Sequence, residues 1–159
     1  MWVVVLDHGN GNVLAKKTFG GTGSDVARAL APAPGGGLYI GGVTTSNNNG
    51  DVGANKGSSD FYIVKVDQDL NITWKNNFGG THIEDLHALT TGAGNVLIAA
   101  GSTKSNNTGD VGASRGGDDF WVIQNNANTG ALEWKKQFGG NVLVARDGWV
   151  VNHKRVYRL

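Results

Sequence analysis

Asp60-Phe61-Tyr62-Ile63-Val64 recurs later in the chain as Asp119-Phe120-Trp121-Val122-Ile123. Gly50-Asp51-Val52-Gly53 recurs with the same offset as Gly109-Asp110-Val111-Gly112. A third landmark, the tripeptide Phe-Gly-Gly, begins at positions 19, 78 and 138. Three landmarks that share one period of about 59–60 residues indicate a tandem repeat, and a repeat decides the architecture before any single residue does.

The unit between the second and third Phe-Gly-Gly motifs predicts four β-strands. Residues 84–90 and 132–138 alternate between apolar and polar side chains, whereas residues 96–101 and 120–123 are continuous apolar runs. Turns rich in Gly and Asn separate these stretches. This pattern is typical of β-strands. Because no stretch before residue 141 has a helical period, the predicted fold class is all-β.

Two long loops complete the repeat. Residues 46–60 and 105–119 are mostly Asn, Gly, Ser, Ala and Asp. The rest of each unit is about 44–45 residues, close to the ~40–45 residues of a propeller blade. We therefore expect an incomplete β-propeller of about two and a half four-stranded blades, each of about 59–60 residues. It cannot close by itself, because closed propellers need about four blades or more.

The repeat divides the chain into five expected parts. They are a partial blade at 1–18, complete units at 19–77 and 78–137, the start of another unit at 138–140, and an unrelated basic tail at 141–159.

Composition favours a folded domain without disulfides. Five Trp, five Phe and three Tyr need a core to bury them, and 26 Gly suit many tight turns. The absence of Cys excludes disulfides and cysteine-ligated metals. The net charge of +1 divides into +3 for residues 141–159 and −2 for residues 1–140, which sets the tail apart from the body.

No targeting segment is recognised. The apolar run at 2–6 is too short for a signal-peptide core and has no basic residue before it. No stretch approaches the roughly 20 apolar residues that span a bilayer. The chain is therefore expected to be soluble and, if expressed in this form, cytoplasmic.

The repeated landmarks, together with the Trp-Lys-Lys at 134–136, resemble the repeat of secreted β-propeller proteins common in Bacteroidetes. The resemblance covers residues 1–140 and departs from the pattern at Ala15, where later repeats have Trp74 and Trp134, and at Asn125-Asn126, which replaces Val66-Asp67. Members are often large surface proteins exported by the type IX system, and some are described as endoglucanase-like. The resemblance implies an extracellular or cell-surface parent protein and transfers no catalytic residue.

Two functions follow from this resemblance. The first is a non-catalytic fragment of a secreted or cell-surface propeller that supports adhesion or ligand binding. The alternative is an accessory propeller of a glycan-degrading enzyme. The expected partners are missing propeller blades or a second copy joined through open sheet edges, and a glycan or protein ligand.

The tail has a different resemblance. Residues 144–159, which include Gly148-Trp149-Val150-Val151-Asn152-His153-Lys154-Arg155-Val156-Tyr157-Arg158-Leu159, are similar to a short stretch of DDE-class insertion-sequence transposases, and none of that family's catalytic carboxylates is present. The interpretation is a junction between a propeller gene and a mobile element, or a misassembled gene. Val142, Leu143 and Val144 are strand formers that could pair with the open edge of the preceding unit, whereas the chain beyond Asp147 is expected to be a short helix or disordered, with Asn152 as an N-cap.

The tail also suggests a third hypothesis, weak binding of nucleic acid, which ranks well behind the first two. Three basic side chains could contact phosphates weakly and without sequence preference: Lys154, Arg155 and Arg158.

Aspartates and asparagines of the repeats are the other candidate site residues. Asp51, Asp60, Asp110 and Asp119 are candidate ligand-binding residues, although an Asp before a strand also commonly bonds to local backbone. Oxygen ligands for calcium could come from Asn47, Asn49, Asp51, Asn106 and Asp110. Neither loop has the rhythm of a calcium loop or a closing bidentate Glu, and such clusters are ordinary turn chemistry.

Aromatic and histidine residues allow two further hypotheses. Four aromatic residues, Trp74, Phe78, Trp134 and Phe138, could stack on sugars, but their spacing on one strand face favours packing between sheets. The stretch 82–87 holds His82, Glu84, Asp85 and His87, which do not recur in the other unit. Acid–base or metal use of these four is open, and surface variation is the alternative. No catalytic residue is assigned, so no enzyme activity is predicted.

Overall fold

The computed structural model describes residues 1–139, 143–144 and 150–151, and in these residues every regular element is a β-strand. The all-β prediction is therefore confirmed. The strands are β1 (Trp2–Leu6), β2 (Val13–Thr18), β3 (Asp25–Pro32), β4 (Leu38–Thr44), β5 (Asp60–Val66), β6 (Ile72–Phe78), β7 (Glu84–Gly92), β8 (Val96–Thr103), β9 (Asp119–Asn126), β10 (Leu132–Phe138), β11 (Leu143–Val144) and β12 (Val150–Val151).

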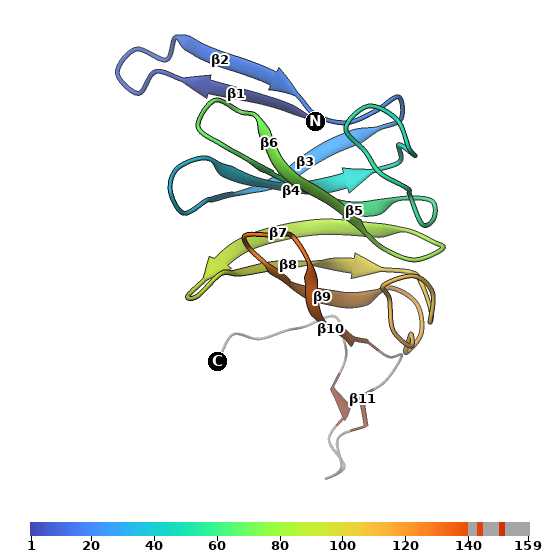
Figure 1. The fold of residues 1–159 in the computed structure, drawn as a ribbon. Coiled ribbons are helices and arrows are strands. Elements are labelled where there is room, and N and C mark those ends of the chain that lie inside the picture. The colour runs from blue at the N-terminus through green and yellow to red at the C-terminus, as the bar shows by residue number, and fades with distance from the viewer. Residues whose placement is uncertain (140–142, 145–149, 152–159) are drawn as a thin grey trace.

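Each complete repeat forms one antiparallel meander of four strands. The first unit has the order β3-β4-β5-β6 and the second has the order β7-β8-β9-β10. β1 and β2 form a two-stranded sheet that corresponds to the third and fourth strands of a unit. Figure 1 shows these three sheets stacked in chain order, from β1 and β2 at one end to β7–β10 at the other.

Irregularities in strand pairing recur with the sequence period. Pairing between the first two strands of a unit skips Arg28 in the first unit and His87, at the equivalent position, in the second. Pairing between the last two strands skips Leu14, Thr73 and Glu133 in the three successive sheets. A β-bulge bends and twists its strand. The sequence repeat is therefore also a repeat of backbone shape.

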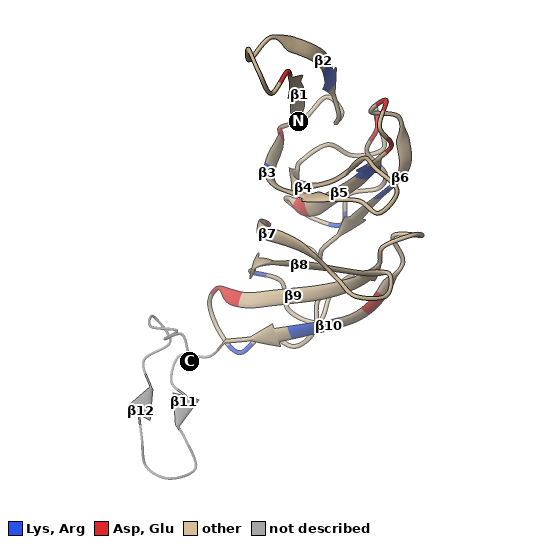
Figure 2. Ribbon diagram, turned by 90° about the vertical axis from the view of Figure 1, so that its left-hand side faces the viewer, with Lys and Arg blue, Asp and Glu red and all other residues tan. Residues whose placement is uncertain are grey.

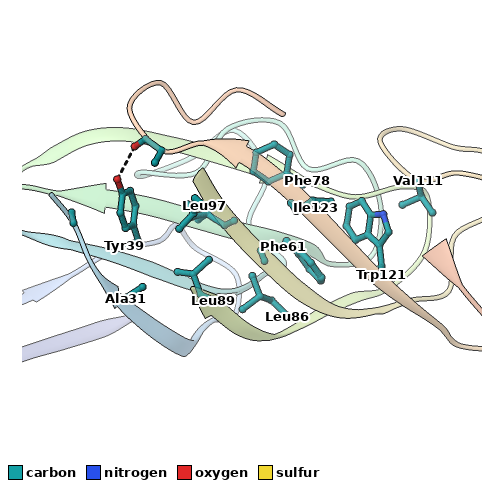
Figure 3. Packing of buried hydrophobic residues seen from close by; sticks show 14 residues of the cluster. Ala31, Tyr39, Phe61, Phe78, Leu86, Leu89, Leu97, Val111, Trp121 and Ile123 are labelled. Carbon is teal, nitrogen blue, oxygen red and sulfur yellow. Dashed lines mark hydrogen bonds between the residues drawn. The ribbon is translucent and has the colours of Figure 1, made fainter. Parts of the chain in front are cut away.

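The main core lies between the two complete units. Phe61, Ile63 and Phe78 of the first unit are buried in one cluster with Leu86 and Trp121 of the second. The rings of Phe61 and Trp121 lie 4.8 Å apart between centroids, at 48°. Figure 3 shows Phe61, Phe78, Leu86 and Trp121 between the sheets, with the hydrogen bond from the Tyr39 hydroxyl to the carbonyl oxygen of Ala127 (2.8 Å) at one end of the cluster.

The N-terminal sheet repeats this packing on the other face of the first unit. Met1, Val3 and Phe19 occupy the positions that Phe61, Ile63 and Phe78 occupy one repeat later. They are buried in a second cluster, together with residues of the first unit that include Ile40, Tyr62, Val64 and Val66. The first unit is thus covered on both faces.

The outer face of the second unit differs. Phe120 and Phe138 are 52% and 54% exposed, although their counterparts Phe61 and Phe78 are 0% and 5% exposed. Packing between sheets is therefore confirmed for Phe78 and for the partly buried Trp74, but it is wrong for Phe138 and for Trp134, which is 40% exposed. The physical reason is that no further sheet covers this face among the described residues.

Part of the tail can be compared with expectation. β11 pairs with β12 and not with the sheet of the second unit. Val150 and Val151 therefore form a strand, where the sequence predicts a helix or disorder after Asp147. The predicted helix and its Asn152 cap lie outside the described residues.

The two phenylalanines provide a direct test of the packing. Phe61→Ala should destabilise the fold by about 3–5 kcal/mol, because it opens a cavity between two sheets. The matched variant Phe120→Ala should cost less than about 1 kcal/mol, because its ring faces outward. Denaturant unfolding in dilute solution measures both values. Equal losses would contradict the stacking described above.

Candidate functional site at the loop end of the units

The long loop of each unit folds onto the Phe-Gly-Gly turn of the same unit. The N–H of Asp51 donates to the carbonyl oxygen of Gly20 at 2.8 Å, and the N–H of Asp110 donates to that of Gly79 at 2.8 Å. The glycine before each aspartate has a left-handed φ of +57° or +56°, and a Cβ there would collide with the same carbonyl oxygen. The repeated Gly-Asp therefore closes the loop end of each unit.

Side-chain oxygens of the loops are already used by the chain. Asn47 Oδ1 accepts the N–H of Asn55 at 3.0 Å, and Asn106 Oδ1 accepts the N–H of Ser114 at 2.9 Å. Asn49 Oδ1 accepts a backbone N–H at 2.6 Å from the turn after the first Phe-Gly-Gly. A cation at these candidate calcium positions would compete with those donors. The described part of the chain contains no group of three or more His, Cys, Asp or Glu placed to hold a metal ion.

Each complete unit is anchored by one carboxylate at the start of its first strand. Glu84 accepts hydrogen bonds from the N–H of Gly80 (2.6 Å) and the hydroxyl of Thr103 (2.7 Å). Asp25 accepts the equivalent bonds from Gly21 (2.8 Å) and Thr44 (2.5 Å). These bonds tie the Phe-Gly-Gly turn to the second strand.

The anchoring role of Asp25 and Glu84 is not among the predictions from the sequence. The available signal is an acidic residue at the same place after the Phe-Gly-Gly motif in both units. A Thr-x-Ser, at 44–46 and 103–105, accompanies it with the offset of the repeat.

Asp60 and Asp119 bond to local backbone, as the alternative interpretation holds. Asp60 Oδ2 accepts the N–H of Lys56 at 2.8 Å, and Asp119 Oδ2 accepts the N–H of Arg115 at 2.9 Å. Both carboxylates are buried. Each carboxylate therefore closes the end of its own long loop, Asp60 before β5 and Asp119 before β9.

Asp60 also faces a carboxylate of the next unit. A Cβ on Gly79 would collide with both Asp60 Oδ1 and Glu84 Oε2, so these carboxylates lie against the same glycine. Burial raises the pKa of Asp60 from 3.8 to about 6, and although the hydrogen bond from Lys56 lowers it, the charge of Glu84 adds to the rise. The junction between units therefore carries a carboxylate whose pKa lies well above its ordinary range.

A lysine bridges the two loops over this junction. Lys56 Nζ lies 2.5 Å from Asp110 Oδ2 and donates to the carbonyl oxygen of Asn77 at 2.8 Å. Asp110 Oδ2 also accepts the N–H of Gly79 at 3.1 Å. The structure thus brings the candidate residues Asp60 and Asp110 to one junction.

The other two candidate aspartates lie elsewhere. Asp51 lines an open depression of about 400 Å³ beside the N-terminal sheet, together with Met1, Trp2 and Asp25. Asp119 lies at the outer face of the second unit, where the side chain of Gln137 donates to it at 2.7 Å. The four aspartates therefore do not form a single site.

The residues at 82–87 do not converge on one point either. Glu84 is buried in its anchor, whereas His82 Nδ1 lies 3.0 Å from the hydroxyl of Thr81. Asp85 lies 3.8 Å from His87 Nε2 and 3.6 Å from Arg28, on the bulged edge of the sheets. This arrangement does not resemble a nucleophile–base pair.

The nucleic-acid candidates Lys154, Arg155 and Arg158 lie outside the described residues. On the described chain, acidic and basic residues are scattered along the strands and loops and do not gather into a band of one sign (Figure 2). The described residues contain no helix that is long and apolar enough to cross a membrane.

The chain matches no protein-family model and no curated protein by sequence.

The Asp60 carboxylate predicts a pH dependence. Because its folded pKa of about 6 exceeds the ordinary 3.8, its protonation favours the folded state fully below about pH 4, and this contribution is lost as the pH rises through 6. Asp60→Asn should therefore raise stability at pH 7.5 by on the order of 2 kcal/mol relative to its effect at pH 4. Unfolding free energies at the two pH values measure this difference.

Asp119→Asn is the matched control for this measurement. It removes the equivalent carboxylate where no counterpart of Glu84 faces it among the described residues. The same pH-dependent gain in this variant would show that burial alone produces the effect and that the facing carboxylate adds nothing to it.

Proposed function

We propose that this chain is a non-catalytic segment of a secreted or cell-surface β-propeller, in which each repeat unit is one blade and the segment serves as an adhesion or ligand-binding scaffold. The observation that carries the proposal is the close approach of the two complete sheets at one strand. Close backbone contacts between them are made by β7, the first strand of the second unit, with β3, β4 and β5. A close approach of neighbouring sheets at the first strand of a unit is what we expect of blades arranged around a propeller axis.

The loop end gives the scaffold its binding surface. Both long loops and the Phe-Gly-Gly turns at 19–21 and 78–80 lie at the same end of the sheets, because antiparallel strands return the chain to that end after every second strand. Binding residues lie disproportionately on loops that a rigid scaffold positions. Repetition presents the same loop once per unit, which suits a ligand that is itself repetitive.

The absence of catalysis in this proposal rests on how the polar groups are used. The carboxylates of Asp25, Glu84, Asp60 and Asp119 accept hydrogen bonds from the turns that they close. Groups held in this way shape the loops and are not directed at a substrate.

A second candidate is the accessory propeller of a glycan-degrading enzyme. The outer face of the second unit favours it, because Phe120, Phe138 and Trp134 are all partly exposed there. The rings of Phe120 and Phe138 lie 6.3 Å apart. Exposed aromatic rings could stack on sugars.

A glycan array and a hydrolase screen on the same protein separate the two candidates. If the chain is a scaffold, we expect no turnover in the screen. We also expect any glycan binding to weaken at least tenfold when both long loops are shortened, at Asn48 and at Asn107. If the chain is an accessory propeller, we expect glycan binding to be lost in the Trp134→Ala variant and not on shortening of the loops. Turnover that disappears in His82→Ala or Asp85→Ala would overturn the non-catalytic assignment.

A further inference from the structure

The two ends of the stack carry complementary faces. At the C-terminal end, Phe120, Val122 and Phe138 occupy the positions of Phe61, Ile63 and Phe78. In the first unit, those three positions are buried against the next sheet. In the second unit, both phenylalanine rings are more than half exposed. This face therefore carries the residues that pack against a neighbouring sheet in the first unit, but none of the described sheets covers it.

The N-terminal sheet offers the opposite surface. Trp2 and Val4 of β1 occupy the positions of Tyr62 and Val64 in β5 and of Trp121 and Ile123 in β9. Tyr62 and Trp121 are fully buried because a preceding sheet covers them, whereas Trp2 is 67% exposed. Leu6, the counterpart of the fully buried Val66, is 55% exposed. β1 thus presents the surface that each complete unit offers to the sheet before it.

Polar contacts of the internal junction also have counterparts at both ends. Trp74 Nε1 donates to the carbonyl oxygen of Ala127 at 3.2 Å, in the turn between β9 and β10. Trp134 occupies the position of Trp74, and His8, in the turn between β1 and β2, occupies the position of Ala127. A sheet that docks in the internal geometry would receive both apolar and polar partners.

We propose that a second copy of this chain occupies the outer face of the second unit through its N-terminal sheet. Phe120 of one copy packs against Trp2 of the other, in the way that Phe61 packs against Trp121 within the chain. This proposal depends only on how the units stack, and it does not depend on whether the long loops bind a ligand. It places the contact on sheet faces, whereas the sequence alone predicts a contact through sheet edges.

The arrangement of the sheets favours a closed assembly. A head-to-tail interface generates a ring when its rotation closes and a filament when it does not. Leaving aside the separate β11-β12 pair, the described residues of two copies contribute four four-stranded sheets and two β1-β2 half sheets, which falls within the roughly four to eight blades of closed propellers. The expected assembly is therefore a dimer in which each copy uses both of its ends once.

The test uses the full chain and its mass in solution across a concentration series, measured by sedimentation velocity. The unmodified chain should dimerise, and Trp2→Ser and Phe120→Ser should each raise the dissociation constant at least tenfold. Leu14→Ser is the matched control, because Leu14 is 64% exposed and its counterparts Thr73 and Glu133 remain exposed in the complete units. Circular dichroism confirms that each variant is folded.

Mixing the two variants separates a head-to-tail contact from a symmetric one. The Trp2→Ser copy keeps an intact outer face and the Phe120→Ser copy keeps an intact N-terminal sheet, so the mixture should form a heterodimer with one native junction. A chain that stays monomeric at all concentrations would overturn the proposal. A dimer that survives Trp2→Ser but not Phe120→Ser would also overturn it, because the outer faces would then pair with each other.

Discussion

Stacking of one apolar sheet face on another is the interaction on which this structure depends. β5 shows the constraint most clearly, since six of its seven residues are buried and they belong to both faces of the strand. Tyr62 and Val64 contact the N-terminal sheet, and Phe61 and Ile63 contact the second unit. A sheet with two apolar faces needs a cover on each side. One unit alone would leave a core face in water, which is why repeat architectures gain stability from their neighbours.

The loop end adds a second constraint, because it buries polar groups. A buried carboxylate is costly unless hydrogen bonds compensate it, and Glu84 is compensated by Gly80 and Thr103. Asp60 has one unpartnered oxygen and faces Glu84. Gly79 lies between these carboxylates and has no room for a side chain. The glycines of the Phe-Gly-Gly motif and the acid that follows it therefore act together to join neighbouring units, at the cost of holding two carboxylates close to each other.

The sequence was sufficient to predict the strands, because each strand of a unit must fill the same place in every repeat. The expected strand 132–138 coincides with β10, and the turns around it follow from Gly and Asn. The sequence could not distinguish Phe61 from Phe120, since both stand in the same motif and only the neighbouring sheet decides which ring is buried. It also could not pair Asp110 with Lys56, because that contact joins non-equivalent positions of adjacent units. A period aligns equivalent residues but does not show which non-equivalent residues meet across a junction.

Because equivalent units follow one another in the same direction, the two ends of the stack are different and mutually complementary. In a sandwich of two unlike sheets, an exposed face has no counterpart elsewhere on the molecule. Here the counterpart is built into the repeat, since the surface around Trp2 and the surface around Phe120 derive from the two sides of the same internal junction. Apolar faces of this kind are costly to leave in water, and exposed patches of them mark interaction sites. The stacking that folds the chain is therefore also the interaction best suited to extend it.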